Sequence, residues 1–321
     1  YLLFHALVAD DRALFERALR WTERHLARGE LAANLPAWLW GRDAHGRFRV
    51  LDRNSAADAD VWMGYALVEA GRVWRAPEHD RLGRALLAEV VRREVRDLPG
   101  LGPALLPAPR GFELEAGRAW RLNPSYLPPQ VARGLATAGV PGPWPALAAA
   151  QRRMLVEASA RGFAPDWTLL RDGSFGPDPV GGAVGGYDAI RVYLWNGMLA
   201  AGHPERAALL AATAGPAALL AEGREPPERV RLTTGEGQGR APPGFLAALL
   251  PDVLARGDRA AAERLRAGLS AARRGAALLG DPPAYYEQNL ALFGEGFAEG
   301  RFRFAEDGRL VPAWEEACLA R

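Results

Sequence analysis

Two carboxylates separated by a single residue stand at the start of a predicted helix. Asp58 and Asp60 lie in segment 55–67, where an apolar helical repeat begins. Aspartate in a first turn is favoured by the helix dipole, so a cap and a surface acid would also explain the pair. A carboxylate that faces a cleft instead orients a substrate or moves a proton. The pair is therefore our first candidate for chemistry.

A third carboxylate, Asp188, follows a pair of glycines and begins another predicted helix. Arg191 lies one turn further along, and the i,i+3 spacing lets its guanidinium pair with Asp188 or orient it. The alternative interpretation is a capping aspartate beside a structural arginine. Carboxylates carried by loops and helix starts near a cleft make glycoside hydrolysis a physically sensible hypothesis.

Aromatic side chains gather close to these carboxylates along the chain. Trp38 and Trp40 lie in a long segment between two predicted helices. Tyr126 and Tyr187 stand at the starts of two other predicted helices, each of which also follows a long segment. Flat apolar rings beside polar groups suit sugar rings, whose CH faces stack while their hydroxyls seek hydrogen bonds. Tryptophans also fill large cores, so both interpretations stay open for each of them.

The elements that must position these residues are mostly helices. Strand signals are few and short, as at 48–51 and Phe302–Phe304, which indicates an all-α class with minor strands. Helical periodicity recurs in about eleven segments: 1–9, 11–27, 57–74, 79–96, 125–138, 145–160, 187–201, 204–221, 243–256, 258–273 and 283–295.

Four connections are much longer than the others: 28–56, 97–124, 161–186 and 222–242. Loops of this length in a compact domain usually carry function. Paired helices predict a helical toroid, in which helices alternate between an inner and an outer ring. The long connections would then gather at one face and form a cleft there.

Composition excludes several classes of protein. The 321 residues are 49% hydrophobic, which is enough for a large core, and the 40 basic residues, all arginine, nearly balance 38 acidic ones. No long run of one charge suggests a nucleic acid partner. The single cysteine, Cys318, leaves no disulfide framework and no cysteine-based metal site, and no apolar stretch is long enough to span a bilayer.

The segment Asn-Ser-Ala-Ala-Asp-Ala-Asp-Val-Trp-Met at 54–63 resembles the signature of glycoside hydrolase family eight. It departs from the usual form at Ala57, where Ser or Thr is common, and this change removes neither carboxylate. The agreement continues in the same order through four further segments: 35–41, 121–129, 187–195 and 302–304. The resemblance covers essentially the whole chain.

The resemblance implies one catalytic domain, 1–321, that lacks its N-terminal segment and folds as an (α/α)6 barrel with an incomplete first inner helix. It implies inverting hydrolysis of cellulose-type β-1,4-glucan, as in family members linked to bacterial cellulose synthesis. Asp188 matches the general base, and Asp58 matches the aspartate that positions the sugar. Inversion needs about 6.5–9.5 Å between acid and base to leave room for water.

The resemblance also gives expectations about binding and location. The implied partner is β-1,4-glucan, with no metal or cofactor, and the protein is expected to be periplasmic or secreted. The oligomeric state stays open, with a monomer as the default. The residues that we expect to bind substrate are Asp60, Trp38, Trp40, Trp62, Asn123, Tyr126, Tyr187, Arg191 and Trp195.

The acid of the reaction is expected outside this chain. In the family a glutamate lies a few positions before the tyrosine that Tyr1 matches, so the proton donor is expected upstream of Tyr1. Glu113, Glu115 and Glu236 stand in no matching context. An N-terminally truncated endoglucanase and an inactive glucan-binding protein that has lost its donor both remain open. A helical scaffold without carbohydrate affinity is the third alternative.

Overall fold

The computed structural model of the protein describes residues 1–275 and 278–315, and Cys318 lies outside them. This part of the chain contains twelve helices. In chain order they are α1 (Leu2–Val8), α2 (Arg12–His25), α3 (Ala57–Val73), α4 (Pro77–Glu94), α5 (Pro129–Thr137), α6 (Trp144–Ala158), α7 (Ala189–Gly197), α8 (Arg206–Ala212), α9 (Gly215–Ala221), α10 (Pro243–Ala255), α11 (Arg259–Ala272) and α12 (Tyr285–Ala298).

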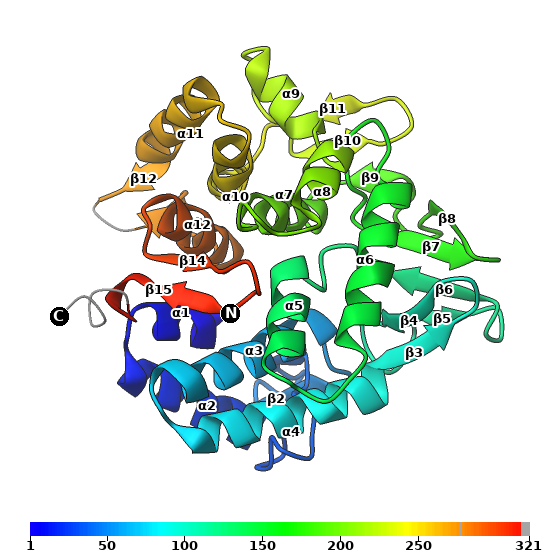
Figure 1. Ribbon diagram of the computed structural model, residues 1–321, viewed down its shortest axis with the longest axis vertical. Coiled ribbons are helices and arrows are strands. Elements are labelled where there is room, and N and C mark those ends of the chain that lie inside the picture. The colour runs from blue at the N-terminus through cyan, green and yellow to red at the C-terminus, as the bar shows by residue number, and fades with distance from the viewer. Residues whose placement is uncertain (276–277, 316–321) are drawn as a thin grey trace.

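Six of these helices form an inner ring. Helix α1 contacts α3, and contacts then run from α3 to α5, to α7, to α10 and to α12. The ring closes where Phe4 of α1 stacks on Phe293 of α12, with 5.1 Å between ring centroids. Figure 1 shows the six helices around the middle of the molecule. These are the contacts that the inner ring expected from the sequence requires.

Most inner helices pack against an outer neighbour in the chain, as in the pairs α1–α2, α3–α4, α5–α6, α7–α8 and α10–α11. The burial of side chains explains this division. Almost every residue of α10 from Gly244 to Val253 is buried, whereas α2 buries only Phe15 and Leu19. A helix enclosed on all sides must be apolar all round, and a helix facing solvent needs only one apolar stripe.

One predicted helix is wrong in its extent. Segment 204–221 divides into α8 and α9, with a break between Thr213 and Gly215. The Gly215 N–H donates to the carbonyl of Gly162, 2.8 Å away. Pro216, which has no N–H, stands in the first turn of α9, where helices tolerate proline. These features start a new helix instead of continuing the old one.

The described residues contain more strands than the sequence indicated, most of them in the four long connections. The strands are β1 (Leu39–Arg42), β2 (Phe48–Asp52), β3 (Val95–Leu98), β4 (Gly102–Leu105), β5 (Glu113–Leu114), β6 (Ala119–Leu122), β7 (Thr168–Arg171), β8 (Ser174–Pro177), β9 (Val184–Gly185), β10 (Arg229–Arg231), β11 (Glu236–Gln238), β12 (Arg273–Arg274), β13 (Leu278–Leu279), β14 (Phe302–Phe304) and β15 (Leu310–Pro312). The strands expected at 48–51 and Phe302–Phe304 are confirmed as β2 and β14.

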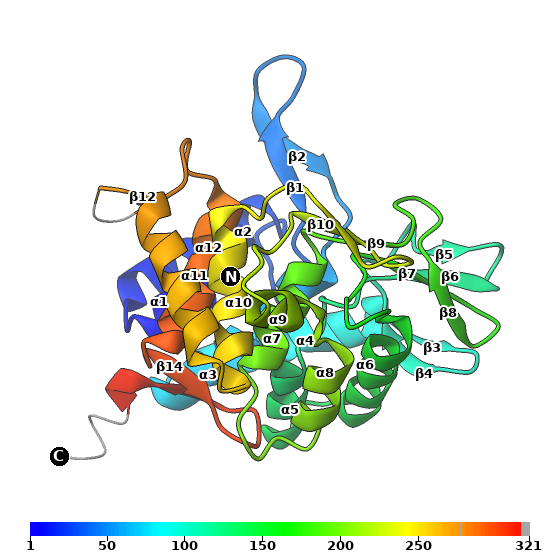
Figure 2. The same ribbon diagram turned by 90° about the horizontal axis from the view of Figure 1, so that it is seen from above.

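Two of the sheets join neighbouring connections. Strands β5 to β8 make a four-stranded sheet from 97–124 and 161–186, and β9 pairs with β10 across 161–186 and 222–242. Every long connection leads into an inner helix, namely α3, α5, α7 or α10. The connections therefore meet at the amino ends of the inner helices, and Figure 2 shows the β1–β2 hairpin projecting from this part of the molecule.

Candidate active site

One buried guanidinium joins the carboxylates of two inner helices. Arg191 of α7 donates from Nη1 to Asp58 Oδ2 at 2.8 Å and from Nη2 to Asp188 Oδ1 at 2.5 Å. Asp58 lies in the first turn of α3, and Asp188 directly precedes α7. The ion pair predicted between Arg191 and Asp188 is confirmed. Its extension to Asp58 brings both candidate aspartates into one site.

Asp188 is not the side chain that caps helix α7. Its carboxylate makes no capping hydrogen bond. Asp166, in the preceding connection, accepts instead from the backbone N–H groups of Gly186, Asp188 and Ala189 at 2.8, 2.9 and 2.8 Å. Because Asp166 satisfies the helix start, the Asp188 carboxylate is left for other partners.

Trp167 is the second partner of Asp188. Its indole Nε1 donates to Asp188 Oδ2 at 2.9 Å. Its ring is held between the stacked ring of Phe112, 5.7 Å away, and the guanidinium of Arg121, 4.0 Å from the centroid. Arginine on one oxygen and indole on the other fix the orientation of the Asp188 carboxylate. Trp167 is not among the residues that the sequence predicted to bind substrate.

Burial raises the pKa of Asp188. The Arg191 guanidinium opposes this change, while the nearby carboxylate of Asp166 adds to it. A carboxylate with a raised pKa is a stronger base than an ordinary aspartate, and it still ionises when a cation and donors hold it. Asp188 thus has the geometry and the electrostatic surroundings of a general base.

Tyrosine hydroxyls complete the surroundings of Asp58. The Tyr1 hydroxyl donates to Asp58 Oδ2 at 3.2 Å and accepts from Arg191 Nη1 at 3.1 Å. The guanidinium of Arg191 also lies 5.4 Å from the ring centroid of Tyr126. Burial raises the pKa of both tyrosines, so both stay protonated and able to donate. Asp58 and these hydroxyls offer the polar contacts that a sugar ring requires.

The expectation that Asp60 binds substrate needs correction. Asp60 is 1% exposed and lies against Glu94, whose Oε1 accepts from Ser55 Oγ at 2.5 Å. Burial raises the pKa of Asp60 well above its usual value, and the neighbouring Glu94 raises it further. Burial also raises the pKa of Glu94, to about 8. The two acids form a buried pair behind Asp58 and present no surface to a ligand.

Two of the expected aromatic contacts also need correction. Trp62 and Trp195 are 1% and 2% exposed, and their ring centroids lie 5.1 Å apart inside the core. Neither offers a face to a sugar. They pack next to Tyr1, whose ring centroid lies 6.1 Å from that of Trp62. Their role is therefore to hold Tyr1 in place from the core side of the site.

The other expected contacts remain near the surface or beside the carboxylates. Trp38 is 56% exposed and Tyr187 is 39% exposed, so both present rings to solvent. Trp40 is half-buried and stacks on Phe48 at 4.8 Å. Asn123 is buried, and its Oδ1 accepts a hydrogen bond from the hydroxyl of Ser125 at 2.7 Å. Trp38 and Tyr187 are the rings best placed to stack on a sugar.

The described residues contain no group of three or more His, Cys, Asp or Glu side chains placed to hold a metal ion. Among residues 1–275 and 278–315, no helix has both the length and the apolar character needed to cross a membrane.

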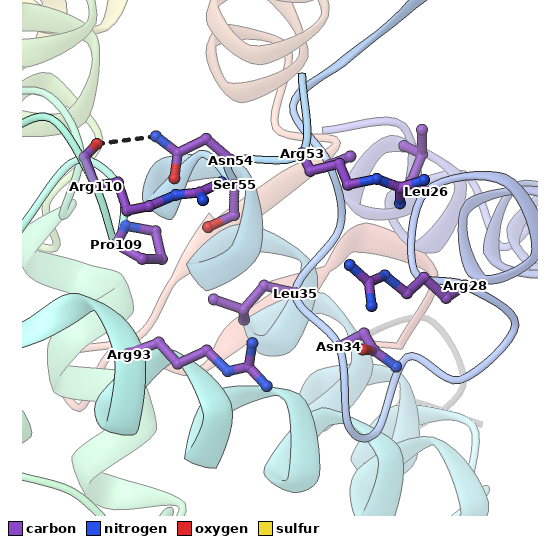
Figure 3. Close-up of a pocket in the computed structure, with 11 residues that line it drawn as sticks. Leu26, Arg28, Asn34, Leu35, Arg53, Asn54, Ser55, Arg93, Pro109 and Arg110 are labelled. Atoms are coloured by element: carbon purple, nitrogen blue, oxygen red, sulfur yellow. Dashed lines mark hydrogen bonds between the residues drawn. The ribbon is translucent and has the colours of Figure 1, made fainter. Parts of the chain in front are cut away.

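A pocket of about 420 Å³ opens beside Asn54 and Ser55, next to the start of α3 (Figure 3).

Comparisons with known proteins give the family to which the chain is similar. The sequence profile of the glycosyl hydrolases family 8 matches residues 1–300. An endoglucanase of Xanthomonas axonopodis pv. citri is 50% identical over all of this chain and 82% of its own length. An endoglucanase of Escherichia coli K12 is 41% identical over 99% of this chain and 83% of its own.

A solved structure is similar over nearly the whole chain. The crystal structure of endo-1,4-D-glucanase from Vibrio fischeri ES114 superposes with a TM-score of 0.89 at 36% identity. The match covers 97% of this chain and 89% of that one.

Proposed function

The chain belongs to the glycosyl hydrolases of family 8, and from this premise we propose that it is an endo-β-1,4-glucanase that inverts the anomeric centre. The observation that carries the proposal is the guanidinium of Arg191, which holds Asp58 and Asp188 together where the long connections meet. The endoglucanases to which the chain is similar support this activity. We also propose that the inner and outer helices form an (α/α)6 barrel.

Asp188 is the proposed general base. It takes a proton from a water molecule as the water oxygen attacks the anomeric carbon of the scissile bond. The glycosidic oxygen leaves with a proton from the glutamic acid expected upstream of Tyr1. Water and leaving group occupy opposite faces of the sugar, so the configuration inverts. Arg191 and Trp167 keep the Asp188 carboxylate aimed at the water.

Asp58 is the proposed sugar-positioning residue. Its carboxylate accepts hydrogen bonds from hydroxyls of the sugar at the cleavage point, with Tyr1 and Tyr126 as further polar contacts. Trp38 and Tyr187 supply exposed rings for neighbouring sugars. Such contacts hold the reacting bond near the attacking water, which lowers the entropic part of the barrier.

The experiment is reducing-sugar release from carboxymethyl-cellulose by the protein with its native upstream sequence. Asp188→Asn is expected to lower kcat about 10²–10⁴-fold, the range of general-base catalysis. Asp97→Asn, which neutralises an exposed aspartate in β3, serves as the matched control and keeps full activity. If the unmodified protein binds cellohexaose but never hydrolyses it, it is an inactive glucan-binding relative instead.

We place the protein in the periplasm or outside the cell, with a role in bacterial cellulose synthesis, on the resemblance described above. Cell fractionation tests the location, and a purely cytoplasmic protein would contradict it. Deletion of its gene in a cellulose-forming host, with measurement of the polymer's chain length, tests the role.

A further inference from the structure

Four arginines line the pocket beside the start of helix α3. The pocket has a volume of about 420 Å³, and Arg28, Arg53, Arg93 and Arg110 contribute to its wall. Among the described residues that form this wall, none is an aspartate or glutamate. Figure 3 shows the guanidinium groups of Arg28 and Arg93 directed into the space between them. Like charges this close repel, and a bound anion relieves the repulsion.

The positive charge of the pocket is only partly balanced by acids outside it. Arg93 pairs with Glu89, with Nε and Oε2 2.6 Å apart, and Arg110 is attracted by Asp52. Arg28 and Arg53 form no ion pair within residues 1–275 and 278–315. Two of the four guanidinium groups therefore keep all of their donors for a ligand.

The pocket lies at the start of helix α3, whose first turn carries Asp58. Asn54 and Ser55 belong to its wall and lie three to four residues before Asp58. The exposed Trp38 is tied to the same place, because its backbone N–H donates to the carbonyl of Asn54 at 2.9 Å. A glucan chain that stacks on Trp38 on its way to Asp58 would pass the mouth of the pocket.

We propose that this pocket binds an anionic substituent, a carboxylate or a phosphate, carried by the β-1,4-glucan substrate. Guanidinium groups form paired, charge-assisted hydrogen bonds with both kinds of oxyanion. A neutral glucan can accept only hydrogen bonds from these four arginines, whereas a substituted glucan also gains an ionic anchor beside its path. This inference rests on the proposed function and names its substrate class more closely.

The test measures binding by the full-length protein carrying Asp188→Asn, which prevents hydrolysis. Isothermal titration compares carboxymethyl-cellulose with hydroxyethyl-cellulose of equal chain length and substitution. We expect tighter binding of the charged polymer, a preference that shrinks in high salt, and competition by inorganic pyrophosphate. The double change Arg28→Gln, Arg53→Gln is expected to weaken carboxymethyl-cellulose binding about tenfold and to leave hydroxyethyl-cellulose binding unchanged.

Arg259→Gln is the matched control, because Arg259 is exposed at the start of α11 and forms no part of the pocket. An equal loss in this control would show a general charge effect and overturn the proposal. Pyrophosphate binding without competition against carboxymethyl-cellulose would also overturn it, since the anion would then be a free phosphate compound. Binding of both polymers without preference overturns this inference alone, whereas binding of neither overturns the proposed function as well.

Discussion

At the scale of single residues, Arg191 is the group on which the site depends. It is buried and balances two carboxylates that would otherwise repel each other in a medium of low polarity. Its planar guanidinium reaches Asp58 with one nitrogen and Asp188 with the other. A lysine presents a single ammonium group and cannot reproduce this bridge.

Replacing Arg191 is expected to cost both stability and activity. Arg191→Met leaves the buried Asp58 and the half-buried Asp188 without their cation. The expected loss is about 3 kcal/mol in the free energy of unfolding, the lower end of the range for a buried ion pair, because solvent partly screens Asp188. Urea denaturation measures this loss. At pH 5 the loss should be smaller than at pH 8, because burial raises the pKa of Asp188 and its protonation removes part of the uncompensated charge. Equal losses at the two pH values would contradict the proposed cause.

The indole of Trp167 is expected to set the pH at which activity appears. Its hydrogen bond favours the ionised form of Asp188, so Trp167→Phe raises the pKa of Asp188. Activity requires ionised Asp188, and the acidic limb of the kcat/KM profile should therefore move to higher pH. We expect less than about a tenfold loss of kcat at its optimum, because the base itself remains. An unmoved acidic limb would show that the indole only fills space.

The buried acids Asp60 and Glu94 are expected to make stability depend on pH. Burial raises the pKa of Glu94 to about 8, from 4.5 in the unfolded chain. Between these values the unfolded chain has released a proton that the folded protein keeps, so stability falls as pH rises from about 4.5 to about 8. Glu94→Gln removes this contribution, and its free energy of unfolding should vary less across the range.

Urea denaturation at pH 5 and pH 8 measures this dependence. Glu78→Gln, an exposed change on the same helix, is the control and should keep the dependence of the unmodified protein. The same slope in Glu94→Gln would contradict the raised pKa.

The sequence predicted that Asp58 and Asp188 lie at helix starts and that Arg191 pairs with Asp188, and the structure shows both. These features were predictable because helix starts and i,i+3 spacing are local. The prediction failed for Asp60, and helix geometry gives the reason. Residues i and i+2 point to different sides of a helix, so when Asp58 faces the site Asp60 must face elsewhere. Which side of α3 faces the site depends on how the helix packs, and the spacing of residues in the sequence does not give this information.

At the scale of elements, helix α7 begins where Asp166 collects three backbone N–H groups. This contact joins a residue before β7 to a helix that starts more than twenty positions later, so no local pattern in the sequence indicates it. The inner helices were predictable from their apolar periodicity. The two- to four-residue strands of the long connections were mostly not, because such short runs show no reliable alternation.

Removing the Asp166 cap is expected to destabilise the start of α7. Asp166→Ala should lower the free energy of unfolding by about 1–2 kcal/mol, as for other helix caps, while Asp166→Asn keeps one acceptor oxygen and loses less. Thermal denaturation of the two variants measures the difference. Hydrogen exchange should also be faster at the amides of Gly186 and Ala189. Unchanged exchange there would mean that the cap does not hold the helix start.

At the scale of the whole molecule, the ring of inner helices decides which residues meet. Asp58 and Asp188 come together because α3 and α7 present their amino ends to the same side of the ring. Paired helices and long connections predicted this arrangement from the sequence. The distances between the inner helices were not predictable, because they depend on close contacts between backbones. One such contact lies between α10 and α12.

The spacing between α10 and α12 is expected to depend on Gly294. A Cβ atom at this position of α12 would overlap the carbonyl oxygen of Ala247 in α10, so Gly294→Ala must push the two helices apart. The expected cost is about 1–3 kcal/mol of stability. Gly296→Ala is the matched control on the same helix, because its Cβ would meet Phe302 only at an ordinary 3.5 Å.

The intrinsic helix preference of alanine over glycine, up to about 1 kcal/mol, applies to both variants and favours folding in each. Gly296→Ala should therefore melt at or above the temperature of the unmodified protein, whereas Gly294→Ala melts below it. Because the displaced helices carry no residue of the proposed catalytic pair, kcat of folded Gly294→Ala should change far less than its stability. Equal melting temperatures of the two variants would show that the ring tolerates a wider spacing between α10 and α12.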